Sequence, residues 1–327
     1  MTQAPSPTPS PSLRIWQVEC TLQALESVEL PDYLGCTLRG GLGQAFRALA
    51  CTVELPECSK CRELVDCPYG MMWEMPAPLG TPARYATPPR PYVIEPPLTH
   101  QGSFAPGERL HCTVKLMGRA RRHLPYFILA LREASHRGLG RGKGRLDLVE
   151  VRGLDPQGSP IRLYTGGKHR KLEADGILAE TELSFDAAEL QDEHTRHRVR
   201  LLLESPLQLK DGERLARELD PVVFTARLVE RFDLLTLFYE GCRQSLPFEA
   251  LKQSARQVRV LQQKLRWHHF ERYSRRSGRV PMNGLLGEVE LAEVPAALVS
   301  LWKMAEHLHV GKQSAFGFGR VRVEHIN

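Results

Sequence analysis

The feature that most constrains the fold of this chain is an internal repeat, in which each half closes with a helix, a glycine-rich loop and a strand. In the first half, an apolar helical stripe over residues 124–134 leads into glycines spaced two residues apart between 138 and 144. In the second half, a similar stripe over 294–308 leads into the glycine-rich run 309–320. Repetition of a whole unit within 327 residues indicates two related domains rather than one large core.

Apolar spacing predicts the other elements of both halves, because alternating apolar residues indicate strands and apolar residues three and four apart indicate helices. The first half should contain a strand over 13–30, a helix over 35–49, a strand over 110–116, a helix over 124–134 and a strand from 146 to 149. The second half should contain a strand over 197–209, helices over 222–239 and 248–270, a strand over 285–291, a helix over 294–308 and a strand over 321–323. Strand, helix, strand, strand, helix, strand is the ferredoxin-like order, so we expect an α+β chain with a tandem double ferredoxin-like, or RRM-like, fold.

The domain boundaries follow from this repeat. Residues 1–12 are mostly Pro, Ser and Thr, and they should form a flexible tail because they have almost nothing apolar to bury. We expect a first ferredoxin-like domain over 13–155, with a cysteine-rich insertion at 51–67. A charged connection over 156–196 should join it to a second ferredoxin-like domain over 197–327, which carries the second glycine-rich loop.

Composition and charge narrow the class of protein. A hydrophobic content of 42% with 25% charged residues is typical of a soluble globular chain. No apolar run approaches the roughly 20 residues that cross a bilayer, and the N-terminus lacks a signal-peptide pattern, so we expect a cytoplasmic protein without membrane contact. A formal net charge of +6 favours a polyanionic partner.

Basic residues are concentrated in two runs, 119–145 and 252–279, where only Glu133 and Glu271 oppose them. A single run of this kind is usually the solvated face of a helix. Two runs, one in each half of a repeated chain, instead favour two surfaces that bind a phosphate backbone.

Four of the eight cysteines, Cys51, Cys58, Cys61 and Cys67, lie within 17 residues and include one Cys-x-x-Cys pair. In a reducing compartment such a cluster indicates metal binding more often than disulfides. Four thiolates suit a structural zinc ion, although an iron-sulfur cluster has the same ligands. The alternative is that these are free or partly buried thiols.

Several motifs resemble one known family in the order in which they occur. The run 309–320, the segment 272–276 followed by 284–287, and in the first half the segments 38–43 and 118–126 are similar to the CRISPR precursor-processing endoribonucleases of the RAMP superfamily, the family called Cas six. The resemblance covers nearly the whole chain after the tail. It implies that the protein binds CRISPR repeat RNA, cuts precursor RNA into guide RNAs without a catalytic metal, and often retains the product, alone or with other Cas proteins in an effector complex.

The basic and glycine-rich segments supply the RNA-binding candidates. Glycines allow positive φ angles and close backbone approach, so that amides can reach phosphate oxygens. The candidates are Arg119, Arg121, Arg122, Arg141, Lys143, Arg145, Arg272, Arg275, Arg276, Gly311, Lys312, Gln313, Ser314, Gly317 and Gly319. The alternative for each loop is a plain helix-to-strand connection that needs glycine for its geometry.

Cleavage by the RNA's own 2′-hydroxyl would need a base, an acid and cations around the charged transition state. The family resemblance implies a histidine or tyrosine in or just after the first helix, but residues 35–49 contain no histidine. The catalytic candidates are therefore His123, which begins the second helix, with Tyr33 and Arg39; His268 and His269 form a second possibility.

Two other functions fit the same residues. The missing helix histidine favours a RAMP subunit that holds guide RNA in an effector complex and cuts nothing. A zinc-stabilised module that binds structured RNA outside CRISPR immunity is a third reading. Cleavage of a cognate repeat in EDTA would separate the enzyme from both.

Overall fold

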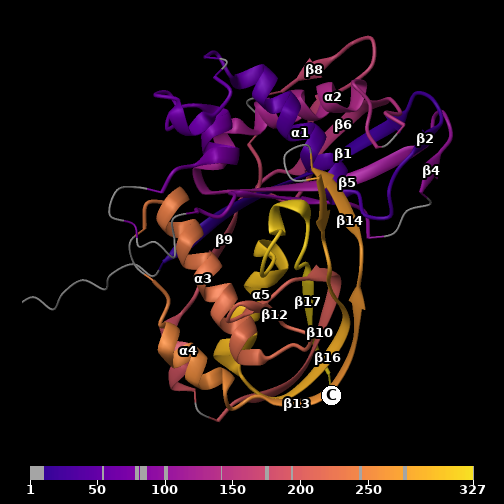
Figure 1. The fold of residues 1–327 in the computed structure, drawn as a ribbon. Helices are drawn as coiled ribbons and strands as arrows, with labels where there is room; N and C mark the ends of the chain where they lie inside the picture. The colour runs from indigo at the N-terminus through magenta and orange to yellow at the C-terminus, as the bar shows by residue number, and fades with distance from the viewer. Residues whose placement is uncertain are drawn as a thin grey trace, which may run out of the picture.

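The computed structural model describes residues 11–53, 55–77, 81, 87–98, 102–140, 142–173, 177–192, 194–242, 245–274 and 278–326. Two large antiparallel sheets, each covered on one face by helices, dominate the described part of the chain (Figure 1). Within the described part of the chain, no helix is long and apolar enough to cross a membrane.

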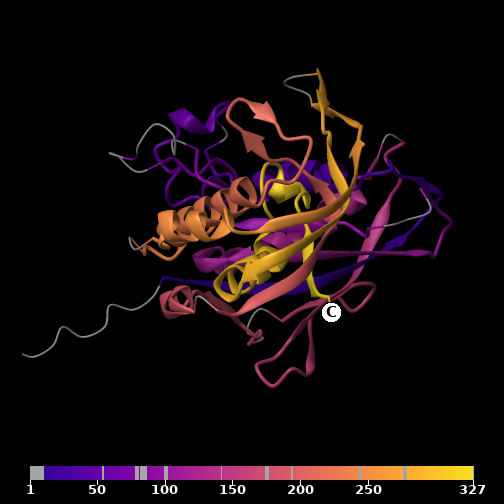
Figure 2. The same cartoon turned by 90° about the horizontal axis from the view of Figure 1, so that it is seen from below.

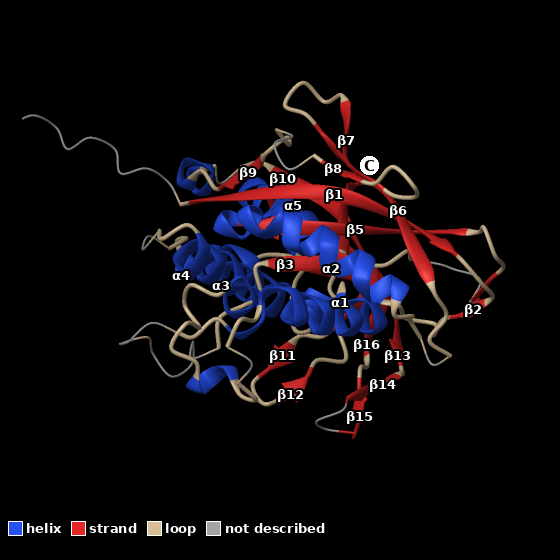
Figure 3. Cartoon of the chain, turned by 90° about the horizontal axis from the view of Figure 1, so that it is seen from above, coloured by secondary structure: helices blue, strands red, loops and turns tan. Residues whose placement is uncertain are grey.

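The first domain has the ferredoxin-like strand order. Its elements are β1 (Ser12–Ala24), α1 (Gly35–Ala50), β3 (Tyr92–Glu95), β5 (Arg109–Met117), α2 (Leu124–His136) and β6 (Leu146–Leu154). The sheet runs β3-β5-β1-β6 and continues through β7 (Pro160–Thr165) and β8 (Lys171–Leu172), while β9 (Thr181–Ser184) pairs with the start of β1. Helices α1 and α2 lie side by side over this sheet (Figure 3).

The second domain repeats this order. Its elements are β10 (Arg196–Leu207), α3 (Pro221–Tyr239), α4 (Phe248–Ala255), β13 (Arg259–His268), β16 (Gly284–Pro295), α5 (Ala296–Leu308) and β17 (Val321–His325). The strand order β13-β16-β10-β17 places its first and third strands in the centre, as β1 and β5 are in the first sheet. The tandem double ferredoxin-like fold predicted from the repeat is therefore confirmed.

Short elements complete the two domains. They are the ladders β2 (Val28–Glu29) with β4 (Ser103–Phe104), β11 (Lys210–Asp211) with β12 (Arg214–Leu215), and β14 (Glu271–Ser274) with β15 (Gly278–Pro281), and the single turns Cys58–Lys60, Gly70–Glu74, Gly118–His123, Ala187–Gln191 and Ser314–Phe316. Strand β14 continues the long edge of the second sheet upward to the first domain (Figure 1), and the same hairpin projects from the sheet when seen from below (Figure 2).

Burial alternates along the central strands, and this alternation explains why each sheet covers a core. In β1, Val18, Cys20 and Leu22 are buried under the helices of the first domain. Leu13 and Ile15, at the start of the same strand, belong instead to the core of the second domain. The first strand is therefore shared by two cores, and the domains form one packed unit.

One predicted helix is wrong. The segment 248–270 was expected to be helical throughout, but the helix ends at Ala255 and Arg259–His268 forms the edge strand β13. Its pairing with β16, for example Gln263 opposite Val289, outweighs a weak local pattern, because strand formation depends more on neighbours than on intrinsic preference. The structure also ends the first predicted strand at Ala24, with a short β2 after it, and adds the unpredicted β3 within the Pro-rich stretch.

Candidate functional site

The second glycine-rich loop, residues 309–320, packs closely against the first domain. The hydroxyl of Tyr33 donates a hydrogen bond of 2.7 Å to the Phe316 carbonyl. A Cβ on Gly35, the first residue of α1, would lie 1.9 Å from that same oxygen, and a Cβ on Gly317 would lie 2.6 Å from the carbonyl of Ile94 in β3. Gly317 also has φ of +84°, where a side chain is strained. These glycines therefore let the loop sit between the start of α1 and the end of β3.

Two arginines meet on the Phe316 ring at this junction. The Arg39 guanidinium, from α1, lies 4.7 Å from the ring centroid, and that of Arg272, from β14, lies 5.3 Å away. The Nε atoms of both are buried and lack a hydrogen-bond partner. Among the described residues, neither has a carboxylate within ion-pair distance. Stacking on an aromatic ring leaves guanidinium N–H groups available, so this pair is suited to a phosphate group.

An aromatic cluster packs with Phe316, the ring on which both arginines stack. Tyr33 lies 5.1 Å from both Phe270 and Phe318, and Phe270 lies 5.4 Å from Phe318, centroid to centroid. His268 at the end of β13 lies 5.4 Å from Phe270. The β13–β14 segment is thus fixed against α1, and it brings an imidazole, the usual proton-transfer group near neutral pH, to the edge of the cluster.

Burial suppresses ionisation of two other groups at the junction. It raises the pKa of Tyr33 well above its ordinary value. It also raises the pKa of Cys36 to about 11, although Arg272 and Arg39 oppose the change. Both groups keep their protons at neutral pH, so neither is a ready base.

The structure brings two of the three predicted catalytic residues together. Tyr33, just before α1, and Arg39, within α1, both contact Phe316 of the segment Ser314–Phe316. His123 lies elsewhere: its ring faces Tyr126, which packs against Phe46, two turns beyond Arg39 on α1. It is 8% exposed, and burial together with Arg122 lowers its pKa to about 4.

The predicted RNA-binding residues of the first half are more scattered. Arg119 and Arg122 are exposed on the turn before α2, and Arg121 is half-buried there. In the first glycine-rich loop, Lys143 is exposed, whereas Arg145 is paired with Glu26 at 3.1 Å. Arg141, Arg275 and Arg276 lie outside the described residues.

The amides of the second glycine-rich loop are largely used inside the protein. Lys312 N–H donates to the Gln208 carbonyl, Phe316 to Gln313, Gly317 to Ser314 and Gly319 to Pro206. A Cβ on Gly311 would collide with Gln208, Gln313 has φ of 64°, and Ser314 is buried. Of the backbone amides expected to bind phosphate, those of Gly317 and Gly319 therefore already have partners within the protein.

Sequence reasoning missed three parts of this site. Phe316 was seen only as a loop residue, although a lone aromatic between glycines is a usable signal. Phe270 was assigned to the end of a helix, and Arg272 was predicted to bind RNA without any indication that both residues approach α1. Lys312 also lies close enough to Lys210 and Arg227 that burial and these two cations lower its pKa, and only the fold brings these residues together.

The four clustered cysteines lie in the loop between α1 and β3. No disulfide joins any of the eight cysteines, all of which are described. The Cys61 N–H donates to the Cys58 carbonyl at 2.9 Å, which forms a tight turn. Among the described residues, however, no three His, Cys, Asp or Glu side chains are grouped closely enough to hold a metal ion. The zinc or iron-sulfur site predicted at these four cysteines therefore stays a prediction.

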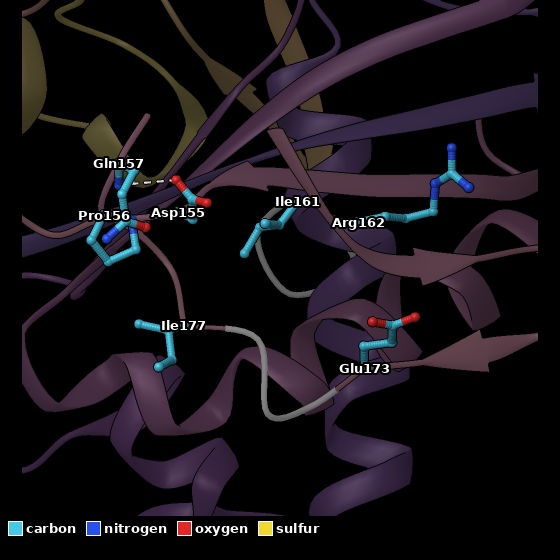
Figure 4. A pocket seen from close by; sticks show the side chains of 7 residues that line it. All are labelled: Asp155, Pro156, Gln157, Ile161, Arg162, Glu173 and Ile177. Carbon is cyan, nitrogen blue, oxygen red and sulfur yellow. Dashed lines mark hydrogen bonds between the residues drawn. The ribbon is translucent and has the colours of Figure 1, made fainter. Parts of the chain in front are cut away.

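A surface pocket of about 500 Å³ lies in a part of the sequence remote from the four clustered cysteines (Figure 4). It lies at the turn between β6 and β7 and is lined by Asp155, Pro156, Gln157, Ile161, Arg162, Glu173 and Ile177. It contains none of the predicted site residues.

Comparisons with known proteins agree with this architecture. Residues 13–176 match a family model of an N-terminal domain (AF_1859_N), and residues 201–321 match the model of the CRISPR-associated endoribonuclease Cas6. No curated protein matches.

Solved structures share the fold. A Cas6 product complex matches with a TM-score of 0.54 and 17% identity, covering 95% of this chain and 100% of the other. Thermus thermophilus Cas6 matches with a TM-score of 0.50 and 15% identity, covering 95% and 99%. A partial Cas6-RT-Cas1–Cas2 complex matches with a TM-score of 0.57 and 12% identity, covering 96% of this chain and 46% of the other.

The fold and the junction thus define a tandem ferredoxin-like protein whose candidate site lies between its domains. Its second domain matches the model of the CRISPR-associated endoribonuclease Cas6, and the chain shares the fold of solved Cas6 structures.

Proposed function

We propose that this chain binds CRISPR repeat RNA and cuts precursor RNA into guide RNAs at the junction of α1, β14 and the second glycine-rich loop. The observation that carries the proposal is the pair of guanidiniums on Phe316, neither paired with a described carboxylate. Cations held in a partly buried site strongly stabilise the charge that develops on a phosphate in the transition state. Cleavage would take place in the cytoplasm, where we expect the protein to act.

The chemistry that suits these groups is transesterification without a catalytic metal. The 2′-hydroxyl of the nucleotide 5′ to the cut attacks the phosphorus of the adjacent 3′-phosphate. The bond from that phosphorus to the 5′-oxygen of the next nucleotide then breaks. The products carry a 2′,3′-cyclic phosphate and a 5′-hydroxyl, so one proton leaves the nucleophile and one joins the leaving oxygen. Guanidinium, imidazole and phenol groups can assist these steps, whereas Mg²⁺ prefers oxygen ligands such as carboxylates.

We assign the roles as follows. Arg39 and Arg272 bind the scissile phosphate and stabilise its transition state. His268 moves a proton, because it lies on the same β13–β14 segment as Arg272 and reaches the cluster through Phe270. Tyr33 holds the loop through Phe316. His123, buried beside Tyr126, is the weaker catalytic candidate on these contacts.

A second function uses the same surface without cleavage. A RAMP subunit that only holds guide RNA in an effector complex with other Cas proteins would also need cations at this junction. The absence of a histidine from α1 and the burial of the Tyr33 hydroxyl favour this alternative.

Incubation of the purified protein with its cognate repeat RNA in EDTA separates the two. The enzyme should produce one discrete cut in each repeat. Binding without cleavage in both EDTA and Mg²⁺ would favour the non-catalytic subunit.

A further inference from the structure

His309 has a backbone conformation that its residue type disfavours. It follows the last residue of α5 with φ of 60° and ψ of 149°, close to a region that is essentially restricted to glycine and costs other residues of order 1–3 kcal/mol. The side chain is fully buried. A glycine would relieve the strain, so a histidine here indicates that the ring contributes something in return.

Both nitrogens of that ring lie beside acceptors. Nδ1 is 2.9 Å from the Phe318 carbonyl in the glycine-rich loop, and Nε2 is 2.8 Å from Oε1 of Glu95 in β3. Since both partners accept, the ring donates to both only as an imidazolium. Burial lowers the pKa of His309, and Glu95 opposes this effect. Glu95 thus favours the imidazolium, which donates a hydrogen bond from each nitrogen.

Glu95 is the centre of a buried charge network that joins the domains. It is 5% exposed and lies 2.5 Å from Lys115 Nζ of β5 and 3.5 Å from the Arg320 guanidinium. Burial alone would raise its pKa, but His309 and Lys115 outweigh burial and hold the pKa at about 2. Arg320 is shared with Glu204, at 2.8 Å, and Lys115 also donates to the Glu306 carbonyl at 3.0 Å.

The network lies directly behind the candidate site. Glu95 follows Ile94, whose carbonyl faces Gly317. His309 is hydrogen-bonded to the carbonyl of Phe318, two residues beyond Phe316. A shift of this segment would move Phe316 away from Arg39 and Arg272, which approach it from other elements.

We propose that Glu95 and His309 are positioning residues, which hold the second glycine-rich loop on the first domain and so keep Phe316 between its two arginines. The RNA-dependent part of this inference rests on the proposed function. The positioning itself does not, and it can be measured in RNA-free protein.

The test is hydrogen exchange of the loop amides of Lys312, Gly317 and Gly319. His309→Gly relieves the backbone strain and removes the ring, so a merely structural turn would become as ordered or more so. We expect instead that these amides exchange roughly tenfold to a hundredfold faster, the effect of losing hydrogen bonds to a charged group. His309→Gln, which can still reach Glu95, should recover part of the protection.

Glu95→Gln should have the same effect, with Glu290→Gln as the matched control, because Glu290 pairs with Arg198 and Arg200 on the second sheet. Thermal unfolding would show which variants fold. Should Glu95→Gln unfold because Lys115 loses its partner, the His309 variants decide the question.

Unchanged exchange in His309→Gly would overturn the positioning role. If exchange is faster in His309→Gly but the wild-type protein cuts no RNA, the positioning role stands and the proposed function is refuted. If the wild type does cut, the single-turnover cleavage rate at saturating RNA should fall at least tenfold in His309→Gly and in Glu95→Gln. A variant with both substitutions should lose less than the product of the two single losses, because the residues act through one contact.

Discussion

Replacement of Arg39 by methionine is the perturbation that tests the candidate site most specifically. Methionine keeps an unbranched apolar side chain beside Phe316 and removes the guanidinium, whose distance to the ring is 4.7 Å. The lost cation–π contact is worth about 0.5–2 kcal/mol, so the protein should stay folded with a modestly lower Tm. The effect on the reaction should be much larger.

The magnitude follows from the position of the charge. Removal of one preorganised group that stabilises transition-state charge typically costs about 10² to 10³ in rate. Arg272, at 5.3 Å from the same ring, remains, so a residual rate is expected. Arg39→Lys keeps the charge but loses the planar fork, and it should fall between the wild type and Arg39→Met.

The assay is single-turnover cleavage of a repeat RNA in EDTA, together with affinity measured at several salt concentrations. Loss of one phosphate contact should reduce the slope of log affinity against log salt by roughly 0.7 for a single strand. Arg162→Met is the matched control, because Arg162 is paired with Glu150 at 2.5 Å and lies on β7. Wild-type cleavage by Arg39→Met, or an equal loss in Arg162→Met, would refute the assignment.

Three further predictions concern other parts of the chain. His268→Ala should lower the cleavage rate by roughly 10² to 10⁴ with little change in affinity, whereas His123→Ala should mainly lower the Tm; the reverse result would restore His123 as the catalytic candidate. Lys312→Ala should weaken RNA binding and flatten its salt dependence, and unchanged affinity and slope would remove this residue from the RNA-binding surface. Elemental analysis should find near-stoichiometric zinc or iron that Cys58→Ser with Cys61→Ser loses, while fully stable wild-type protein without metal would contradict the metal prediction.

The sequence predicted those elements whose pattern is both local and strong. Helices α1, α2, α3 and α5 have apolar stripes that are set by their own spacing, and the repeated loop after the second helix of each half indicated two copies of one fold. The edge strand β13 could not be predicted in this way, because its outer residues are exposed and its partner β16 is supplied by the fold. Strand β3 was missed because its four residues are all buried and show no alternation.

The candidate site was predictable only in part for a related reason. Tyr33 and Arg39 are close in sequence to a recognisable helix, so they could be chosen from it. Phe316, Arg272 and Glu95 come from segments far apart in the chain, and their proximity depends on how the two domains pack. No local pattern contains that information.

If the substrate's own 2′-hydroxyl is the nucleophile, removal of that hydroxyl alone should abolish cleavage. A repeat RNA with a single deoxyribose at the nucleotide 5′ to the cut lacks one hydroxyl and no phosphate, so it should bind as tightly as the unmodified RNA. We expect it to be uncut in EDTA, while the unmodified RNA yields a 2′,3′-cyclic phosphate end. Cleavage of the deoxy substrate, or cleavage of either RNA only after Mg²⁺ is added, would rule out metal-independent attack by the 2′-hydroxyl.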